Sequence, residues 1–366
     1  MIVDVPLLLQ PGAPMEMRRV KVGEPGPSEV LVRVVASGVC HSCLHAADGS
    51  HVGIPMPIVL GDEGSGIVEV VGAPTSELSV GDHVILSWAP GCGLCRFCAL
   101  GRPGLCLRAP ALGSMSDGTT RFSLDGEPVY HYGPASYAPF TVVPERAAVK
   151  IPKDVPLDVA ALIGCSVTTG VGAVLNSADV RPGQSVAVFG CGGVGVNAVQ
   201  GAAIAGANPI IAVDVSAARL DTAWQFGATL LVDASSGDPA EEIRSMTGIG
   251  VDCAVVAVGK TEAIEQAWSC LAPGGICVVV GNPPTDAPPI RIDPHTVLGG
   301  ERRLVGSVYG SSAPLEAFPR LLALYRSGGL KLDELVTDRY RPEQANEAFT
   351  ALARGEIGRG LIVFEP

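Results

Sequence analysis

The stretch VFGCGGVGVNAVQGAAIAGA, residues 188–207, decides the class of fold. A β-rich run ends at Phe189, and glycines follow as Gly190-x-Gly192-x-x-Gly195 at the start of a helix-forming run. The next apolar run ends in an acid, Asp214, nineteen residues after Gly195. A strand, a glycine turn, a helix and a second strand that ends in an acid predict a dinucleotide-binding βαβ unit.

Each position of the glycine motif has a physical task. Gly190 permits a tight turn, and Gly192 lets backbone N–H groups approach a pyrophosphate. Gly193 and Val194 open the helix, whose N-terminus favours the phosphate charge, and Gly195 brings helix and strand close together. We therefore expect these five residues to bind the cofactor.

The acid at the end of the second strand selects the cofactor. Asp214 would accept hydrogen bonds from the adenosine ribose hydroxyls and would repel a 2′-phosphate, which favours NAD over NADP. Arg219 lies five residues further on and could instead contact the 2′-phosphate of NADP. We expect Arg219 and Gly281, which ends the run GGICVVVG, to be further cofactor contacts.

The pattern of strand-like and helix-like runs predicts two domains. From Val159 strand-like and helix-like runs alternate, which predicts right-handed crossovers and a doubly wound parallel sheet of the α/β class. From about Glu29 the chain instead has short β-rich runs such as EVLVRVVASG, and β-rich character returns after about Arg303. We expect a β-rich domain of residues 1–158 and 303–366 and a Rossmann domain of residues 159–302.

Composition excludes several classes of function. The net charge of −12 argues against nonspecific binding of nucleic acid. The mean hydropathy is +0.36, but the longest uncharged stretch, Pro182–Val213, fits a buried strand–turn–helix–strand better than a membrane span. The start, MIVDVPLLLQPGAP, lacks the basic and long apolar regions of a signal peptide, so we expect a cytoplasmic location.

Four of the eleven cysteines lie within fifteen residues, in a loop rich in Gly and Pro. Four thiolates around one zinc ion make a closed structural site without a position for water. An iron–sulfur cluster or a set of redox thiols is the alternative. The spacing therefore predicts a structural zinc lobe over residues 92–106, with the ligands Cys92, Cys95, Cys98 and Cys106.

The order of these features resembles the zinc-containing alcohol dehydrogenases of the medium-chain dehydrogenase/reductase family. Cys40, the GDEGSG loop at residues 61–66, the cysteine lobe, Cys165 with Thr169, and the glycine motif follow one another along nearly the whole chain. The resemblance implies a GroES-like catalytic domain joined to the Rossmann domain. The stretch DGTTRFSLDGEPVYHYGPASYAPFTVV is similar to class III-type and related bacterial members, which implies a homodimer.

The resemblance also implies a role for several single residues. Cys40 and Cys165 match two ligands of the catalytic zinc, and Glu63 matches an acid beside the third ligand. Ser42 and His45 match a relay that carries the proton of the alcohol to solvent.

The remaining matches concern the cofactor. His41 and Arg359 match contacts to the pyrophosphate, and Thr169 matches a residue behind the nicotinamide ring. Taken singly, His41 and His45 could each be ordinary surface histidines.

Two positions depart from the family pattern. Asp62 stands where the family usually has a histidine ligand, and Cys43 stands where many members have an aspartate that orients this histidine. The two changes are consistent, because a carboxylate ligand has no N–H for a second carboxylate to accept. Zinc could be held by Cys40, Asp62 and Cys165 with water or Glu63 as the fourth ligand, Cys43 could join them, or this site could be empty.

The favoured interpretation is an NAD-dependent zinc enzyme that interconverts small alcohols with aldehydes or ketones. A zinc-independent reductase of polarised double bonds on the same scaffold is one alternative. The other is a nonenzymatic NAD-binding protein whose Cys40, Cys43 and Cys165 act as redox-sensing thiols.

Overall fold

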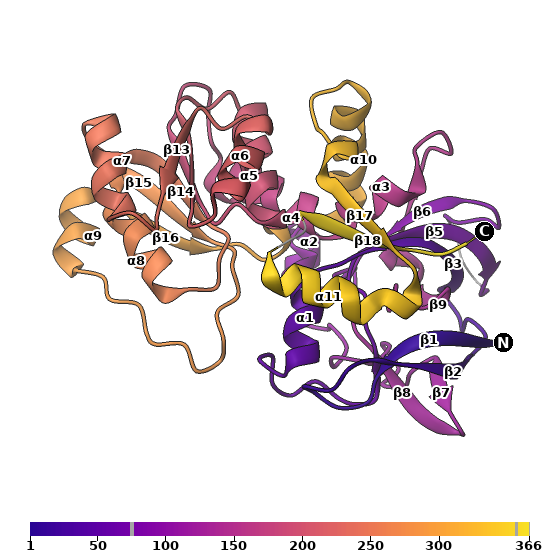
Figure 1. Cartoon of the computed structure of the whole chain (residues 1–366). Helices are drawn as coiled ribbons and strands as arrows, with labels where there is room; N and C mark the ends of the chain where they lie inside the picture. The colour runs from indigo at the N-terminus through magenta and orange to yellow at the C-terminus, as the bar shows by residue number, and fades with distance from the viewer. Residues whose placement is uncertain (74–76, 356–357, 366) are drawn as a thin grey trace. The chain divides into compact units, whose positions relative to one another are not determined.

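The structure is a computed structural model that describes residues 1–73, 77–355 and 358–365 (Figure 1). The chain forms two compact units. The first unit comprises Met1–Cys165, Ala313–Ala323 and Leu332–Pro366, and the second comprises Ser166–Ser312 and Leu324–Lys331.

The second unit is built on a six-stranded sheet in which every strand pair is parallel. In spatial order the strands are β13 (Leu230–Asp233), β12 (Ile210–Asp214), β11 (Val186–Phe189), β14 (Val251–Val256), β15 (Leu271–Val279) and β16 (Arg303–Gly306). All residues of β11 and β12 are buried, as expected for parallel strands covered on both faces.

Helices cover both faces of this sheet (Figure 1). One pair of neighbouring helices is α5 (Gly193–Ile204) and α6 (Ala217–Gln225), and the other is α7 (Pro239–Thr247) and α8 (Thr261–Ser269). The unit also contains α4 (Ser166–Gly172) and α9 (Pro294–Gly300). The doubly wound α/β fold predicted from the alternating runs is confirmed.

The boundary predicted at residue 303 was wrong. Strand β16 pairs with β15 in parallel register, with Leu304 opposite Cys277, and therefore completes the Rossmann sheet as an edge strand. The chain returns to the first unit only at Ala313. The first crossing also lies later than the predicted residue 158, because the first unit continues through α3 (Leu157–Ala160) and a 3-10 turn to Cys165.

The first unit contains two β structures. One is a closed barrel of β1 (Ile2–Leu8), β2 (Glu16–Val22), β7 (Phe122–Leu124), β8 (Glu127–His131) and β4 (Ile58–Val59). The other is a seven-stranded sheet in the order β10 (Ala148–Ile151), β6 (His83–Leu86), β5 (Gly64–Val71), β3 (Glu29–Gly38), β18 (Arg359–Val363) and β17 (Val336–Tyr340), with β9 (Phe140–Pro144) also paired to β3. The predicted β-rich domain is therefore confirmed as a class.

Two short helices of this unit lie beside cysteines. They are α1 (His41–Asp48), which begins directly after Cys40, and α2 (Arg96–Ala99) in the cysteine lobe. The later helices of the chain are α10 (Pro314–Arg326) and α11 (Ala345–Arg354). An amphipathic pattern in α11 buries Ala345, Ala348, Phe349 and Leu352 in the core of the first unit.

Among the described residues, no single helix has the length and apolar composition needed to cross a membrane. One bent pair, Leu157–Gly164 with Ser166–Ala178, meets that test by length and composition only. Most of its residues are buried within the structure, as in core helices of globular proteins.

Candidate functional site

Two groups of potential metal ligands occur among the described residues, and both lie in the first unit. In each group the ligand atoms are all within 4.8 Å of one another. One group is the cysteine lobe, Cys92, Cys95, Cys98 and Cys106, and the other is the buried set Cys40, Asp62 and Cys165.

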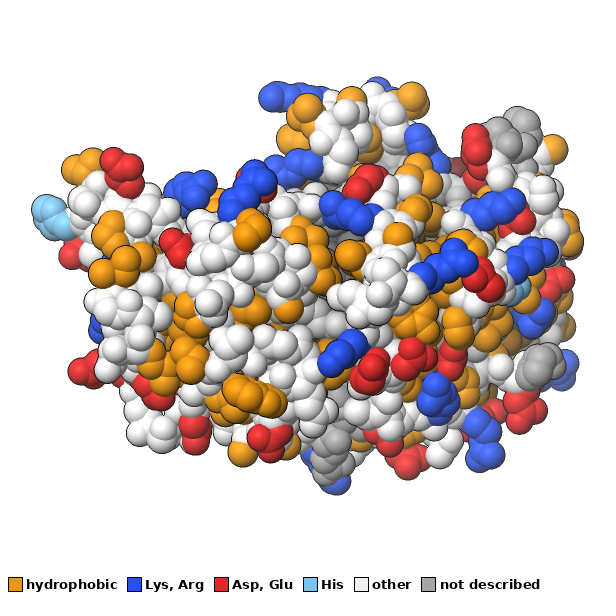
Figure 2. All heavy atoms as spheres, turned by 90° about the horizontal axis from the view of Figure 1, so that it is seen from above, with side chains coloured by type: hydrophobic (Ala, Val, Ile, Leu, Met, Phe, Trp, Pro, Cys, Tyr) orange, Lys and Arg blue, Asp and Glu red, His pale blue; other side chains and the backbone are white. Residues whose placement is uncertain are grey.

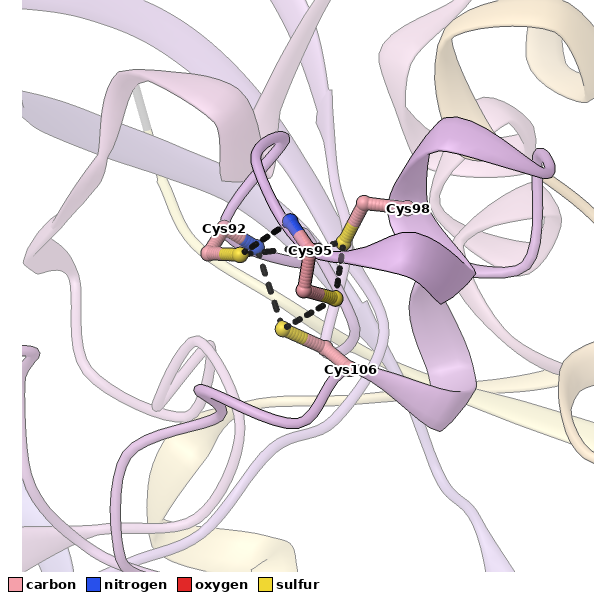
Figure 3. Close-up of side chains that lie close together, drawn as sticks. All are labelled: Cys92, Cys95, Cys98 and Cys106. Atoms are coloured by element: carbon pink, nitrogen blue, oxygen red, sulfur yellow. Dashed lines mark hydrogen bonds between the residues drawn. The ribbon is translucent and has the colours of Figure 1, made fainter.

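The four thiols of the cysteine lobe converge on one point (Figure 3). The Sγ–Sγ distances are 4.0 Å for Cys92–Cys98, 3.5 Å for Cys95–Cys98 and 3.9 Å for Cys95–Cys106. A tetrahedral zinc with Zn–S bonds of about 2.3 Å has S–S edges of about 3.8 Å. The lobe therefore fits a structural zinc ion.

Backbone N–H groups of the lobe stabilise negative charge on the sulfurs. Cys92 Sγ accepts from the N–H groups of Leu94 and Cys95, at 3.4 and 3.3 Å. Cys106 Sγ accepts from the N–H groups of Cys92 and Arg108, at 3.3 and 3.4 Å. Backbone N–H donors, first that of Cys98, lower the pKa of Cys95 to about 6. The thiolate form that metals bind is therefore favoured at Cys95 before any metal arrives, whereas burial raises the pKa of Cys106 to about 11.

The buried set is assembled from three distant segments. Cys40 lies between β3 and α1, Asp62 lies between β4 and β5, and Cys165 ends the segment after α3. All three side chains are buried, and Cys165 Sγ lies 3.6 Å from Asp62 Oδ2. Two sulfurs and one carboxylate oxygen are accepted zinc ligands, and three protein ligands leave a tetrahedral ion one open position.

The electrostatics of the buried set suit a cation. Burial, together with the negative charge of Cys40, raises the pKa of Asp62 to about 8. A hydrogen bond from the Cys165 thiol holds the pKa of Cys40 well below its ordinary value, and the Arg359 guanidinium adds to this effect. Several acidic groups compete for protons in a space with little solvent, which a bound divalent cation would relieve.

The loop that carries Asp62 is fixed from behind by side chains that sequence reasoning missed. Ser37 Oγ and Ser136 Oγ donate to the Glu63 carbonyl at 2.8 and 3.0 Å, and they lie 2.6 Å from each other. Gly61 has φ +112°, and a Cβ there would lie 2.6 Å from the Ser136 and Tyr137 nitrogens. No local sequence signal could identify this contact, because Ser136 is remote from the GDEGSG loop along the chain.

The predicted proton relay lies beside the buried set. Ser42 Oγ is 3.6 Å from Cys40 Sγ, in the first turn of α1. His45 follows three residues later on the same helix, and its ring is 6.2 Å from that of His41, centroid to centroid. Residues three apart are neighbours on a helix surface, so α1 brings Ser42 and His45 together. The roles of Ser42, His45 and His41 stay predictions.

Glu63 and Arg359, for which separate roles were predicted, contact each other in the structure. Both side chains are almost fully buried and form an ion pair, Arg359 Nη2 with Glu63 Oε1. Gly38 at the end of β3 makes room for this pair, since a Cβ there would collide with the Glu63 carboxylate. The proposed contact of Arg359 with a pyrophosphate stays a prediction.

The glycine motif of the second unit has the expected local geometry. Gly190 follows β11 with φ +86°, and Gly192 caps α5. A Cβ added to Gly192 would meet no atom within 4 Å, so the turn leaves open space above the helix N-terminus. A Cβ at Gly195 would collide with the Gly190 carbonyl, which accounts for the third glycine.

Asp214 closes the glycine turn. Its Oδ2 accepts from the Cys191 backbone N–H at 2.7 Å, and its Oδ1 accepts from the Ser216 N–H at 3.0 Å. These bonds orient the carboxylate, and each oxygen keeps a further lone pair for a ribose hydroxyl. This contact with Cys191 was not predicted from the sequence. Its only signal in the sequence was the position of Cys191 between Gly190 and Gly192, within the glycine turn.

The other predicted cofactor residues lie around the same sheet. Val194 is in the first turn of α5. Helix α4 packs closely against this turn, and its Gly170 leaves room for the Val194 carbonyl, with which a Cβ at position 170 would collide. Thr169 precedes that glycine on α4. Gly281 follows β15 and donates its N–H to the Val256 carbonyl at 2.9 Å, while Arg219 lies on α6. Their contacts with a cofactor stay predictions.

Two family models match the chain. The alcohol dehydrogenase GroES-like domain matches residues 26–153, and the zinc-binding dehydrogenase model matches residues 193–327. A curated relative, the NDMA-dependent alcohol dehydrogenase of Amycolatopsis methanolica, is 36% identical over 96% of both chains.

Solved structures agree with these matches. The benzyl alcohol dehydrogenase of Acinetobacter calcoaceticus is 34% identical, with a TM-score of 0.95 and full coverage of both chains. A protein from Sinorhizobium meliloti 1021, described as a zinc-binding dehydrogenase bound to NADP, is 25% identical, with a TM-score of 0.83 and full coverage of both chains.

The fold and the site define a zinc-type dehydrogenase. The chain belongs to the zinc-containing alcohol dehydrogenases of the medium-chain dehydrogenase/reductase family.

Proposed function

We propose that this chain is an NAD-dependent zinc enzyme that interconverts alcohols with aldehydes or ketones by hydride transfer. The observation that carries the proposal is the buried set Cys40, Asp62 and Cys165 with the Ser42 hydroxyl beside it. Three protein ligands leave a tetrahedral zinc ion one position open, which is the usual arrangement of a catalytic rather than a structural zinc.

When bound, zinc would act as a Lewis acid on the substrate oxygen, and NAD would accept the hydride. The chain supplies binding and proton transfer. The Ser42 hydroxyl accepts the proton of the alcohol and donates its own to His45, one turn further along α1, which passes a proton to solvent. Arg359, paired with Glu63, places a positive charge near Cys40 and Asp62 and offsets part of their negative charge.

The choice of NAD is supported by the position of Asp214. Its carboxylate ends β12 beside the glycine turn, oriented by two backbone N–H groups. A negative charge there disfavours the 2′-phosphate of NADP by like-charge repulsion and accepts the 2′-hydroxyl of NAD.

We propose primary aromatic alcohols as the first substrates to test. The relative from Acinetobacter calcoaceticus is named a benzyl alcohol dehydrogenase. In this chain Trp88 follows β6 and lies close to the Asp62 loop. Both residues border Gly133, where an added Cβ would lie 3.1 Å from Trp88 Cβ and 3.2 Å from Asp62 Cα. An aromatic side chain near the metal ligands suits a flat apolar substrate.

We further propose that the chain forms a homodimer through the edge strand β16. Among the described residues this strand pairs on one side only, with β15, and neighbouring apolar side chains are exposed, namely Val297, Leu298, Leu304 and Val308. An exposed sheet edge with apolar flanks is an association surface. Light scattering should give twice the mass of 37.4 kDa, and Val305→Pro in the edge strand should give a monomer.

One experiment tests the enzymatic proposal. The purified chain should contain two zinc ions, and it should reduce NAD with benzyl alcohol. A chain with one zinc that reduces enones would instead be a zinc-independent reductase. A chain with one zinc and no turnover, whose buried thiols respond to oxidants, would be a redox sensor.

A further inference from the structure

Cys43 is the one residue of the α1 segment whose contact with the buried set has no role in the proposed reaction. Its side chain is fully buried, and its Sγ lies 3.4 Å from Asp62 Oδ1. The other carboxylate oxygen, Oδ2, faces Cys165 Sγ at 3.6 Å. The two oxygens of Asp62 therefore have different neighbours.

The direction of the contact follows from the chemistry of the two groups. In the structure the Cys43 thiol is the donor to Asp62 Oδ1, and a metal-bound carboxylate, which is ionised, can only accept hydrogen bonds. A Cys43 thiolate would instead add another negative charge to the buried set of Cys40, Asp62 and Cys165. Cys43 is also outside the group of ligand atoms that lie within 4.8 Å of one another.

We propose that Cys43 is a positioning residue that donates its S–H to Asp62 Oδ1 and leaves Oδ2 for the metal. Asp62 would then bind through one oxygen in a fixed orientation, and Cys43 would remain outside the coordination sphere. Hydrogen bonds to metal-bound carboxylates orient them in this way and raise metal affinity. This inference rests on the proposed function, in which Asp62 is a zinc ligand.

The thiol has a second consequence for the site. A neutral donor fixes the carboxylate without changing the number of charges around the metal. A hydroxyl in the same place would keep the donor, whereas a methyl group would remove it. Cys43→Ser and Cys43→Ala therefore separate the hydrogen bond from the sulfur.

The first measurement is metal retention. The unmodified chain and both variants are loaded with zinc and dialysed against a graded series of a competing chelator. We expect Cys43→Ala to hold the second zinc about 10- to 100-fold more weakly while the zinc of the cysteine lobe is unchanged. Cys43→Ser should stay near the unmodified value. Cys277→Ala is the control, since it removes a buried thiol of β15 outside both groups.

The second measurement tests whether the sulfur is a ligand. Cobalt(II) in place of zinc gives thiolate-to-metal charge-transfer bands whose intensity follows the number of bound sulfurs. These bands should be as strong in Cys43→Ser as in the unmodified chain. A weaker band in Cys43→Ser, or equal zinc affinity in Cys43→Ala and the unmodified chain, would overturn the proposal.

The third measurement needs no metal. The S–H stretching band of a thiol moves to lower frequency when the thiol donates a hydrogen bond. Infrared difference spectra of the metal-free chain, recorded above pH 8 so that the Asp62 carboxylate is ionised, should show such a band, absent in Cys43→Ala and at higher frequency in Asp62→Ala. Its absence would overturn the inference, whereas the zinc count of the unmodified chain tests the proposed function. Each can therefore fail without the other.

Discussion

The cysteine lobe and the buried set lie in the same unit of the molecule but are assembled in different ways. The lobe takes its four potential ligands from fifteen consecutive residues, and backbone N–H groups of the same loop support its sulfurs. The buried set takes its three potential ligands from segments that span residues 40–165, and remote side chains support it.

The cysteine lobe and the buried set also differ in the chemistry of their metal-binding side chains. Four thiols fill the coordination sphere of a zinc ion and leave it closed, so the lobe is suited to stability. Two thiols and a carboxylate leave a position open, and the hydroxyl of Ser42 lies next to them. The comparison teaches that a local loop can make a closed site, whereas an open site depends on the folded core that surrounds it.

The largest effect that would sharpen this comparison is expected for Asp62→Ala. The variant removes the proposed ligand that distinguishes the buried set, so it should lose the second zinc and reduce alcohol oxidation by about 100- to 1,000-fold or more. NADH binding should be retained, because the variant leaves the glycine motif and Asp214 of the other unit unchanged. Metal analysis, initial rates and NADH fluorescence titration measure the three properties.

Asp48→Ala is the matched control, because it removes an exposed carboxylate at the end of α1. If Asp62→Ala keeps two zinc ions and its rate, Asp62 is not a ligand, and the comparison of an open with a closed zinc site fails.

The second effect is on stability and concerns the lobe. Metal binding contributes folding free energy to a loop that has little apolar core, so Cys95→Ala should lower Tm by about 10 °C and release one zinc. Differential scanning calorimetry with metal analysis checks this. Cys277→Ala should keep both zinc ions. An unchanged Tm with full zinc content in Cys95→Ala would show that the lobe is not a structural zinc site.

The third effect concerns Asp214, whose assembly is intermediate between that of the cysteine lobe and that of the buried set. Its partner Cys191 lies on a different segment of the chain, but one that is only 23 residues away. Asp214→Ser removes both the charge and the acceptor for the ribose hydroxyls. The preference for NADH over NADPH should therefore shrink by about 10- to 100-fold, the scale of a lost charged hydrogen bond. Fluorescence titration gives both Kd values.

Asp233→Ser, at the end of the adjacent strand β13, should leave that preference unchanged. Equal affinity of the unmodified chain for both cofactors would contradict the assignment of Asp214.

The smallest effect concerns charge. Three negative ligands around Zn²⁺ leave a net charge of −1, whereas two thiolates and an imidazole leave none. A negative site stabilises an alkoxide less, so the alcohol loses its proton at higher pH and oxidation should have an alkaline optimum. Asp62→His combined with Cys43→Asp should move the optimum toward neutrality by about one pH unit.

The pH profile of kcat/KM for benzyl alcohol, with each single variant as control, measures this shift. A neutral optimum in the unmodified chain, or no shift in the double variant, would show that ligand charge does not set the pH dependence.

Local signals accounted for most of the fold and for part of the site. Strand and helix periods gave the classes of both domains, since those patterns arise from residues close together along the chain. They did not place the end of the Rossmann unit, because β16 is a short strand that is held by its pairing with β15. The same limit applies to the site, where the pairing of Glu63 with Arg359 depends on β18 lying beside β3.

By itself the sequence determined the cysteine lobe, from the spacing of Cys92, Cys95, Cys98 and Cys106, and the glycine turn, because consecutive residues set both geometries. It also named Asp62 as a departure from the family pattern. Only the tertiary structure decided what surrounds Asp62. The contacts of its carboxylate with Cys43 and Cys165 require the loop before β5, α1 and the end of the first unit to pack together. Packing of distant segments depends on the whole core, and no short stretch of sequence encodes it.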